Sequence, residues 1–332
     1  MSRTRFIDLY AGIGGIRLGF KQAFGDNAKF VFSNEINKYS CMTYKTNFGE
    51  DPIGDITKID SQDISDFDVL LAGFPCQAFS IAGRRLGFGD LRGTQFFEIA
   101  RILKEKQPKA FLLENVKNFR THDKGKTFET VRQTIEDELG YSFHYKLINA
   151  KDFGIPQNRE RFFMVGFREN VHFEFPKPKE DKSNSSRKVG NILEPIVNEK
   201  YFISQKYLDT LKKHRKRHED ANHGFGYIVL KKTDIANTLV LGGMGHERNL
   251  ITDKKSFKKC TKNNANKEAI RKLTPREYFR LQGFSDTYKI TVSDTQAYRQ
   301  AANSVCVPVI REIALCMKHA LEQKKTRSQT NR

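Results

Sequence analysis

A thiol at the end of a predicted strand is the side chain of this chain best placed to do chemistry. Cys76 follows Pro75 directly after the apolar run Val69-Leu70-Leu71-Ala72 and Gly73-Phe74. The apolar run predicts a buried strand, and a proline fixes its own backbone angle φ, so the next side chain leaves the strand in a set direction. Open α/β sheets bind their ligands at the carboxyl ends of their strands, where this thiol would lie. A lone cysteine is more often an inert apolar residue, so a nucleophilic role depends on the residues around it.

A carboxylate and two guanidinium groups belong to further predicted strand ends. Glu114 follows the apolar run Ala110-Phe111-Leu112-Leu113, and Arg159 and Arg161 precede the run from Phe162 to Phe167. Desolvation at an apolar strand end raises the pKa of a carboxyl group, which would let Glu114 hold or donate a proton near neutral pH. Arg161 could direct a fixed cation at a carbonyl oxygen. Helix capping by Glu114 and a strand-edge salt bridge of Arg161 are the alternatives.

A glycine-rich turn and two acids predict a site for an adenosine-bearing cofactor. The first predicted strand, from Phe6 to Tyr10, leads into Ala11-Gly12-Ile13-Gly14-Gly15, where glycines let the backbone approach a ligand closely. Arg17 stands where the last glycine of G-x-G-x-x-G would be, so the turn suits a pyrophosphate less well. Glu35 could accept hydrogen bonds from both hydroxyls of a ribose, and Asp55 from an adenine amino group. S-adenosylmethionine fits this set better than NAD, although each acid alone could be a solvated turn residue.

Strands and helices alternate through the first half of the chain. Apolar runs of strand length begin at residues 6, 30, 69, 110 and 162. Segments with helical apolar spacing separate them, over 16–24, 38–48, 94–106 and 127–139. This alternation is typical of a doubly wound α/β fold with a mostly parallel sheet. A charged, Ser- and Asn-rich segment over 179–188 then predicts a linker, and the last helical spacing covers 307–321.

The charge of the chain indicates a polyanionic partner. The 332 residues include 58 Lys+Arg and 39 Asp+Glu, which gives a formal net charge of +19. Residues 199–280 alone hold 20 Lys+Arg and 9 Asp+Glu. This concentration of positive charge favours a surface that binds nucleic-acid phosphates over the alternative, a soluble basic protein without such a partner. The 5 cysteines are scattered without C-x-x-C spacing, so we expect no disulfide framework, no metal and a cytoplasmic location. No apolar run approaches about 18 residues, so we expect no membrane span.

Six blocks in a fixed order resemble the bacterial cytosine-C5 DNA methyltransferases of type II restriction-modification systems. The blocks are Phe6 to Gly15, Gly73 to Ser80, Glu114 to Val116, Gln157 to Arg161, Leu273 to Gly283 and Asn303 to Val305. The resemblance spans nearly the whole chain and implies a Rossmann-like, S-adenosylmethionine-dependent fold with a second, smaller and irregular domain. Two departures stand out: Ala302 precedes Asn303 where the family usually has glycine, and the block near Gln282 ends in Gly283-Phe284-Ser285 rather than in proline.

The resemblance implies a role for each site residue. Cys76 would add to C6 of a cytosine flipped out of duplex DNA, so that C5 can accept a methyl group and S-adenosylhomocysteine is left as product. Glu114 would contact N3 and the exocyclic amine, Arg161 would hold O2, and Arg159 is grouped with these catalytic residues. The implied cofactor site comprises Phe6, Gly12, Gly14, Gly15, Glu35, Ile36, Asp55, Ile56, Pro75 and Asn303.

The resemblance also predicts a division of the chain. Residues 1–175 and 303–325 would form the catalytic and cofactor-binding domain, 176–285 the target-recognition domain, 286–302 a hinge and 326–332 a frayed tail. The cationic run 212–218, on a predicted helix, is expected to bind phosphates rather than bases. Residues expected to contact DNA are Ser80, Arg84 and Arg92 in a mobile lid, and Thr238, Gly243 and Arg248 in the recognition domain.

The DNA target and the partners are predicted from the same resemblance. Residues 203–249 are similar to the subgroup that methylates CCGG, with the inner cytosine as the expected substrate. There Arg248 could pair with a guanine or, alternatively, form an ion pair with Glu247. We expect a monomer that acts on double-stranded DNA beside a cognate restriction endonuclease, without a stable complex between them. The alternatives are a tRNA cytosine-C5 methyltransferase and a catalytically inactive DNA-binding regulator.

Overall fold

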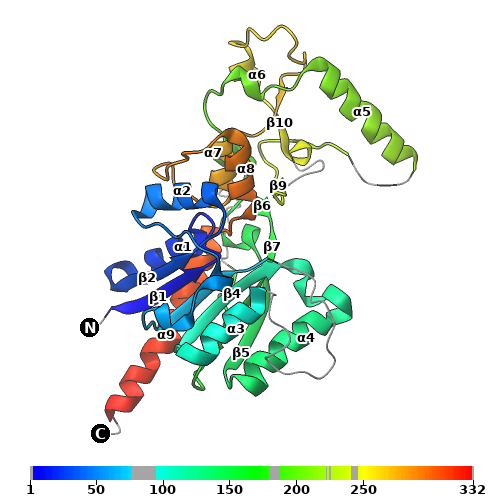
Figure 1. The fold of residues 1–332 in the computed structure, drawn as a ribbon. Helices are drawn as coiled ribbons and strands as arrows, with labels where there is room; N and C mark the ends of the chain where they lie inside the picture. Colours follow the sequence, from blue (N-terminus) through cyan, green and yellow to red (C-terminus); the bar gives the residue numbers. More distant parts are fainter. Residues whose placement is uncertain are drawn as a thin grey trace. The chain divides into compact units, whose positions relative to one another are not determined.

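The computed structural model describes residues 3–75, 95–178, 187–221, 223, 226–240 and 246–330, the last seven by their backbone alone. The chain divides into two compact units (Figure 1). The first unit comprises Met1–Asn149, Glu160–Pro178 and Val307–Arg332, and the second comprises Ala150–Arg159 and Lys179–Cys306. The chain therefore leaves the first unit and returns to it twice.

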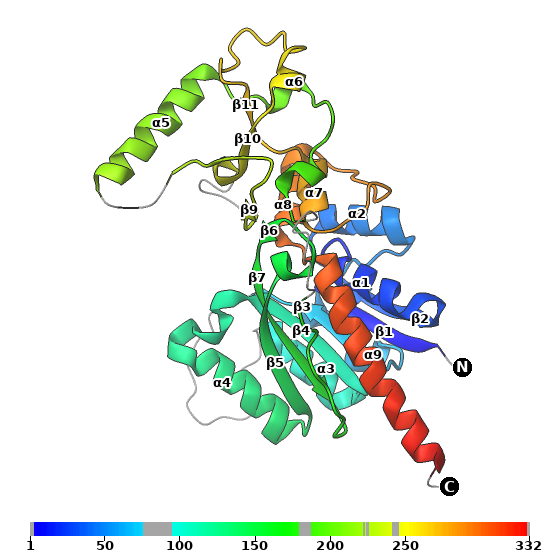
Figure 2. The same cartoon turned by 180° about the vertical axis from the view of Figure 1, so that it is seen from behind.

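A six-stranded sheet forms the centre of the first unit (Figure 2). Its order is β2-β1-β3-β4-β7-β5, with the bounds β1 (Thr4–Leu9), β2 (Ala28–Asn34), β3 (Val69–Gly73), β4 (Ala110–Val116), β5 (Ser142–Asn149) and β7 (Glu160–Phe167). Strands β2, β1, β3 and β4 are parallel, and β7 runs antiparallel between β4 and β5. The predicted doubly wound, mostly parallel α/β sheet is confirmed. Because β2 and β3 flank β1 on opposite sides, the fold has its topological switch point at the carboxyl end of β1.

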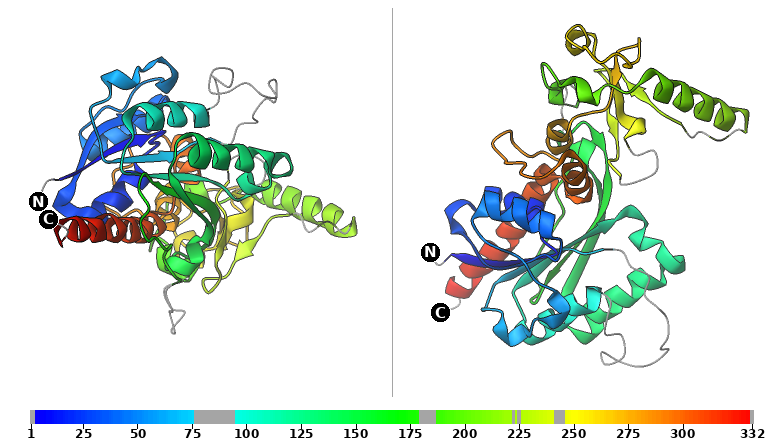
Figure 3. Two further views of the ribbon diagram at one scale, coloured as in Figure 1. Left: turned by 90° about the horizontal axis from the view of Figure 1, so that it is seen from below. Right: turned by 45° about the horizontal axis from the view of Figure 1, so that its top comes forward.

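Helices cover both faces of this sheet, as the apolar spacing predicts. They are α1 (Gly15–Phe24), α2 (Lys38–Phe48), α3 (Gln95–Lys106), α4 (Lys126–Gln133), which a single π turn over Thr134–Glu138 extends, and α9 (Val307–Thr330). Helices α1 and α9 pack side by side on one face (Figure 2), and α3 and α4 lie on the other (Figure 3, left). A Cβ at Gly19 would lie 2.5 Å from Ile310 Cγ2, so a glycine is required where α1 meets α9.

The central strands are apolar because they are covered on both sides. Leu70, Leu71, Leu112 and Leu113 are wholly buried, as expected for parallel strands between two helical layers. Strand β5 has a different pattern, since it is an edge strand whose side chains are mostly half-buried or exposed. The sequence did not predict β5, because its apolar residues alternate with polar ones instead of forming a run.

The second unit consists of short elements around a small core. Its helices are α5 (Gln205–Asp220), α6 (Lys254–Phe257), α7 (Pro275–Leu281) and α8 (Asp294–Asn303). Strands β11 (Ile270–Arg271), β10 (Leu250–Thr252) and β8 (Val229–Leu230) form one sheet, and β6 (Gln157–Asn158) pairs in parallel with β9 (Ala236–Asn237). The core is small and apolar, with Ile203, Leu208, Leu211, Leu250 and Ile270. The predicted helix of the cationic run is α5, and Lys212, Lys213 and Arg217 are exposed on it.

The functional division of the chain stays a prediction, while the compact units have their own bounds. The expected hinge, 286–302, lies within the second unit, and most of it belongs to helix α8. Helix α9 continues to Thr330, past the expected start of the tail at 326. Over the ranges given above, no helix is long and apolar enough to cross a membrane.

Candidate active site at the carboxyl ends of β1, β3 and β4

Glu114 and Arg161 form an ion pair at the ends of two adjacent antiparallel strands. Arg161 Nε lies 3.1 Å from Glu114 Oε1, and the two side chains are only 16% and 12% exposed. Strand register explains the pair, because Glu114 lies opposite Phe163 and Arg161 lies opposite Val116, which makes the two residues diagonal neighbours on one face. The structure therefore brings together two of the four side chains predicted to be catalytic.

The backbone that leads to the predicted nucleophile is anchored beside this ion pair. Gly73 lies opposite Glu114 in the β3–β4 ladder, and a Cβ at Gly73 would lie 3.5 Å from Glu114 Oε2. Phe74 is buried, and its carbonyl accepts a hydrogen bond of 3.1 Å from Asn115 Nδ2. Pro75, the next residue, is exposed. Asn115 had no predicted role, and its position directly after Glu114 is the only local signal for it in the sequence.

Several predicted residues lie outside the described ranges. Cys76 follows Pro75 immediately, so the described chain ends one residue before the expected nucleophile. The other expected DNA contacts outside these ranges are Ser80, Arg84, Arg92 and Gly243. Their roles remain predictions from the sequence.

The glycine turn after β1 lies against Glu35. Gly12 and Gly14 have φ of 54° and 76°, in the left-handed region that glycine adopts readily. The Gly12 amide donates to Glu35 Oε2 at 2.8 Å, and the Asn37 amide donates to Glu35 Oε1 at 2.6 Å. Each carboxylate oxygen keeps a further lone pair, so the half-buried Glu35 is oriented and still able to accept from two hydroxyls. Gly15 begins α1 at this turn.

An exposed apolar side chain and a second acid follow β2. Ile36 is 72% exposed, which is unusual for a large apolar residue beside a buried sheet. Asp55 accepts from the Thr57 amide and hydroxyl, and these bonds hold the pKa of Asp55 below its usual range. The adjacent Ile56 is buried in the core, so a ligand would reach its backbone rather than its side chain. Oriented carboxylates beside an open apolar surface fit an adenosyl group.

The structure corrects the assignment of Phe6 to this site. Phe6 is wholly buried, and its ring packs against Phe20, Phe24 and Phe30 in the core between β1 and α1. The aromatic residue at the carboxyl end of β1 is Tyr10, whose hydroxyl donates to the Gln95 carbonyl at 2.9 Å. The signal for Tyr10 was available in the sequence, since it directly precedes the glycine turn.

A buried acid of β1 was also missed. Asp8 is fully buried, and neither of its oxygens has a hydrogen-bond partner among the described residues. Burial raises the pKa of Asp8 to about 8, against the opposing effect of the Arg17 cation. Arg17 is itself engaged, because it donates to Glu50 Oε1 at 2.8 Å and to the Tyr44 hydroxyl at 2.9 Å. Asp8 is therefore largely uncharged at neutral pH.

In the second unit, Arg159 is placed quite differently from Arg161. It is 2% exposed and donates to the carbonyl groups of Leu239, Ala302 and Ser304 at 3.2, 2.9 and 2.6 Å. These main-chain contacts correct the expectation that Arg159 acts on the substrate. Asn303, between two of these carbonyls, ends α8 and is exposed.

Two further residues of the second unit were expected to contact DNA. Thr238 donates through its hydroxyl to the Asn158 carbonyl at 2.5 Å. Arg248 is exposed, and its backbone carbonyl accepts from Asn237 Nδ2 at 2.8 Å. The carboxylate of Glu247 is bound by the Tyr207 hydroxyl and lies 3.3 Å from Lys272 Nζ. Within the described ranges, no ion pair of Arg248 is found, so its alternative pairing with Glu247 is not formed.

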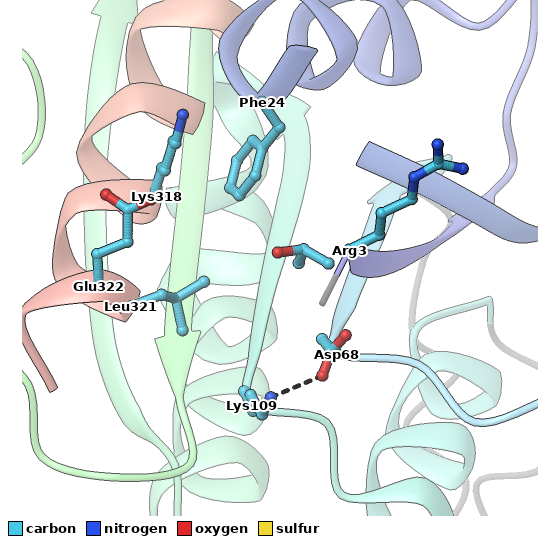
Figure 4. Close-up of a pocket in the computed structure, with 8 residues that line it drawn as sticks. Arg3, Phe24, Asp68, Lys109, Lys318, Leu321 and Glu322 are labelled. Carbon is cyan, nitrogen blue, oxygen red and sulfur yellow. Dashed lines mark hydrogen bonds and ion pairs between the residues drawn. The ribbon is translucent and has the colours of Figure 1, made fainter. Parts of the chain in front are cut away.

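A pocket lies at the opposite, amino-terminal edge of the sheet (Figure 4). Thr4 begins β1, and Asp68 and Lys109 directly precede β3 and β4; the last two form an ion pair of 2.8 Å. This pocket is therefore remote from the strand ends that carry Glu114 and Gly73. Among the described side chains, no three of His, Cys, Asp or Glu are grouped as metal ligands.

The fold and the site together define a class of α/β enzymes that bind an adenosyl cofactor at the switch point of a doubly wound sheet. The family of C-5 cytosine-specific DNA methylases matches residues 4–319. The chain belongs to this family and is a DNA (cytosine-5)-methyltransferase, and the family implies S-adenosylmethionine as its cofactor.

Known relatives resemble the chain over nearly its whole length. It is 50% identical over 330 residues to type II methyltransferase M1.ScrFI of Lactococcus lactis subsp. cremoris, covering 98% of this chain and 80% of that protein. It is 48% identical over 316 residues to M.HpaII of Haemophilus parainfluenzae, covering 92% and 87%. The solved structure of S. pombe Dnmt2 has a TM-score of 0.74 at 20% identity over 96% of this chain and 99% of that one, which supports the fold.

Proposed function

We propose that this protein methylates the inner cytosine of CCGG in duplex DNA, through a covalent bond between Cys76 and the flipped-out base. The observation that carries the proposal is the Glu114–Arg161 ion pair, which lies beside Gly73, three residues before Cys76. A carboxylate and a guanidinium at one strand end match the donors and acceptors on the Watson–Crick edge of cytosine. Only a base outside the helical stack reaches such a site.

The chemistry required of Cys76 follows from the electronic structure of the base. Carbon C5 of cytosine is a poor nucleophile, whereas C6 accepts a thiolate. Formation of the C6–sulfur bond moves the ring electrons so that C5 becomes enamine-like, and Glu114 stabilises the proton gained at N3 while Arg161 holds O2. Loss of the C5 proton to a base then restores the double bond and expels the thiolate of Cys76.

The cofactor residues are assigned in the same way. S-adenosylmethionine, when bound, supplies the methyl group and leaves as S-adenosylhomocysteine. Glu35 would accept the ribose hydroxyls, Ile36 would cover the adenine, and Asp55 would accept from its amino group. Asn303 is included from the family resemblance. The Gly12–Glu35 hydrogen bond supports this assignment, because it orients the carboxylate before a ligand arrives.

Target reading is assigned to the second unit. Thr238, Gly243 and Arg248 would contact the DNA, with Arg248 paired to a guanine. The exposed cations of α5 would bind phosphates and set the salt dependence of affinity. We further propose that the protein acts as a monomer in the cytoplasm and protects DNA from a cognate endonuclease.

Bisulfite sequencing of DNA from cells that express the protein tests this function. We expect protection of the inner cytosine in nearly all CCGG sites, and none in cells that express the Cys76→Ser variant. Tritiated methyl transfer to duplex DNA and to tRNA, measured in parallel, separates the DNA enzyme from its RNA-directed alternative. Methylation of DNA at a different sequence would refute only the CCGG target. Methylation of tRNA without methylation of the duplex, or no methylation of either, would refute the activity on DNA.

A further inference from the structure

We propose that Arg159 is a positioning residue, which holds the segment that contacts DNA and the turn that carries Asn303 in one fixed arrangement. The inference rests on the proposed function, which assigns Thr238 to DNA and Asn303 to the cofactor. It predicts that one buried guanidinium, which touches neither ligand, affects the binding of both.

The contacts of Arg159 converge on the backbone around Asn303. Its Nη2 atom donates to the Ala302 carbonyl at 2.9 Å and to the Ser304 carbonyl at 2.6 Å. Ala302 and Ser304 flank Asn303, so a single nitrogen fixes the peptide groups on both sides of that residue. The Asn303 side chain, which is exposed, is therefore presented from a fixed backbone.

The same guanidinium also fixes the segment that follows Thr238. Arg159 Nη1 donates to the Leu239 carbonyl at 3.2 Å, and the Leu239 amide donates to Gln157 Oε1 at 3.1 Å. Both polar groups of the Leu239 backbone are thus bound by residues of one tripeptide. In addition, β6 pairs with β9, and the Thr238 hydroxyl donates to the Asn158 carbonyl. Residues 236–239 are held to residues 157–159 along their whole length.

Neighbouring amides complete this framework without replacing Arg159. Gln157 Nε2 donates to the Leu281 carbonyl at 2.7 Å, and Gln282 Nε2 donates to the Ala301 carbonyl at 2.6 Å. These contacts hold the ends of α7 and α8, but among the hydrogen bonds described only those of Arg159 join the Leu239 backbone directly to the Asn303 turn. A planar guanidinium offers several donors in fixed directions, whereas a lysine ammonium is a point charge on a flexible stem. Burying the cation is costly, which argues that its donors have a function.

Arg159, whose hydrogen bonds to Leu239, Ala302 and Ser304 we call the clamp, also lies close in sequence to the predicted catalytic residue Arg161. Arg161, which pairs with Glu114, follows Arg159 after a single residue. The five residues from Gln157 to Arg161 therefore bind the recognition segment, the Asn303 turn and the predicted catalytic carboxylate in succession.

The Arg159→Lys variant tests the proposal on the whole enzyme. We expect KM for S-adenosylmethionine and KM for target duplex to rise together, each about 10-fold, while the trapped complex with 5-fluorocytosine DNA still forms. The matched control is Arg168→Lys, since Arg168 is exposed and its guanidinium donates to the Gln107 carbonyl on the surface. This control is expected to change neither KM.

Other outcomes would overturn the proposal. A fall in kcat with both KM values unchanged would mean that Arg159 acts on the base, and a lower melting temperature with unchanged kinetics would mean that it only stabilises the fold. If the variant does not fold, hydrogen–deuterium exchange on the wild-type protein decides: S-adenosylhomocysteine alone should slow exchange in residues 236–239, and unchanged exchange there contradicts the clamp. Failure of the proposed function is distinct, because the wild-type enzyme would then not methylate the duplex at all.

Discussion

Asp8 places a carboxyl group inside the sheet, where burial, rather than a hydrogen-bond partner, determines its protonation state. Asp8 is the second-last residue of β1 and is fully buried, and that burial raises its pKa from 3.8 to about 8. In the unfolded chain the same group ionises near pH 4. The folded protein therefore holds a proton on Asp8 that the unfolded chain has released.

The sign of the resulting pH dependence follows directly. Because the folded state binds more protons, the free energy of unfolding falls as pH rises from about 4 to about 8, by roughly 1 kcal/mol per pH unit. The Asp8→Asn variant removes this term, so its stability should be flatter with pH. Urea denaturation between pH 5.5 and 8 measures both curves, with the exposed Asp26→Asn as control. Parallel curves for wild type and Asp8→Asn would show that Asp8 is charged in the fold.

The sequence predicted the location of a site residue where that location depends only on the neighbouring residues along the chain. Glu114 and Glu35 each follow an apolar run, and the structure places them at the carboxyl ends of their strands. The contacts of Arg159 were not readable, because its partners lie 80, 143 and 145 positions away. Phe6 was misassigned because an aromatic residue at the start of a strand was not distinguished from Tyr10 at its end.

Among the elements, α7 shows how a buried ion pair holds a helix of the second unit. Arg271 and Glu277 are both wholly buried, and two hydrogen bonds of 2.8 Å join them. Glu277 also accepts from the Thr274 amide, which completes a capping box with Pro275 as the first helical residue. The Asp253 carboxylate binds Arg271 from a third direction at 2.8 Å.

We expect Glu277→Gln to lower the free energy of unfolding by about 3 kcal/mol, because it leaves a buried cation undercompensated. The matched control is Glu219→Gln, whose partner Arg215 and own side chain are 49% and 56% exposed, and whose loss should cost less than about 1 kcal/mol. Urea denaturation followed by circular dichroism measures both. Equal losses for the two variants would contradict the assigned role of burial.

Elements with strong periodicity were predicted closely, and weakly patterned ones were not. The spacing over 38–48 matches α2, and that over 16–24 misses α1 by one residue. Strand β5 was missed because Phe143, Tyr145 and Leu147 alternate with polar residues at a half-exposed edge. The two-residue strands of the second unit have no periodicity to detect, and only tertiary hydrogen bonds define them.

For the whole molecule, the order of the blocks predicted more than any single motif. Six blocks in family order predicted the family that the match over residues 4–319 establishes. The net charge of +19 agrees with a DNA substrate, but charge and block order do not specify a recognition sequence. We propose that this information belongs to a few side chains such as Arg248, which would pair with a guanine.

Covalent trapping tests the central claim, that Cys76 attacks the flipped cytosine, most directly. Duplex DNA with 5-fluorocytosine at the target position, incubated with S-adenosylmethionine, should yield a protein–DNA complex that survives denaturing electrophoresis, because fluorine blocks loss of the C5 substituent. The Cys260→Ser control should trap as the wild type does, and Cys76→Ser should not trap at all. A complex that still forms with Cys76→Ser, or none with the wild-type protein on DNA that it methylates, would contradict the account.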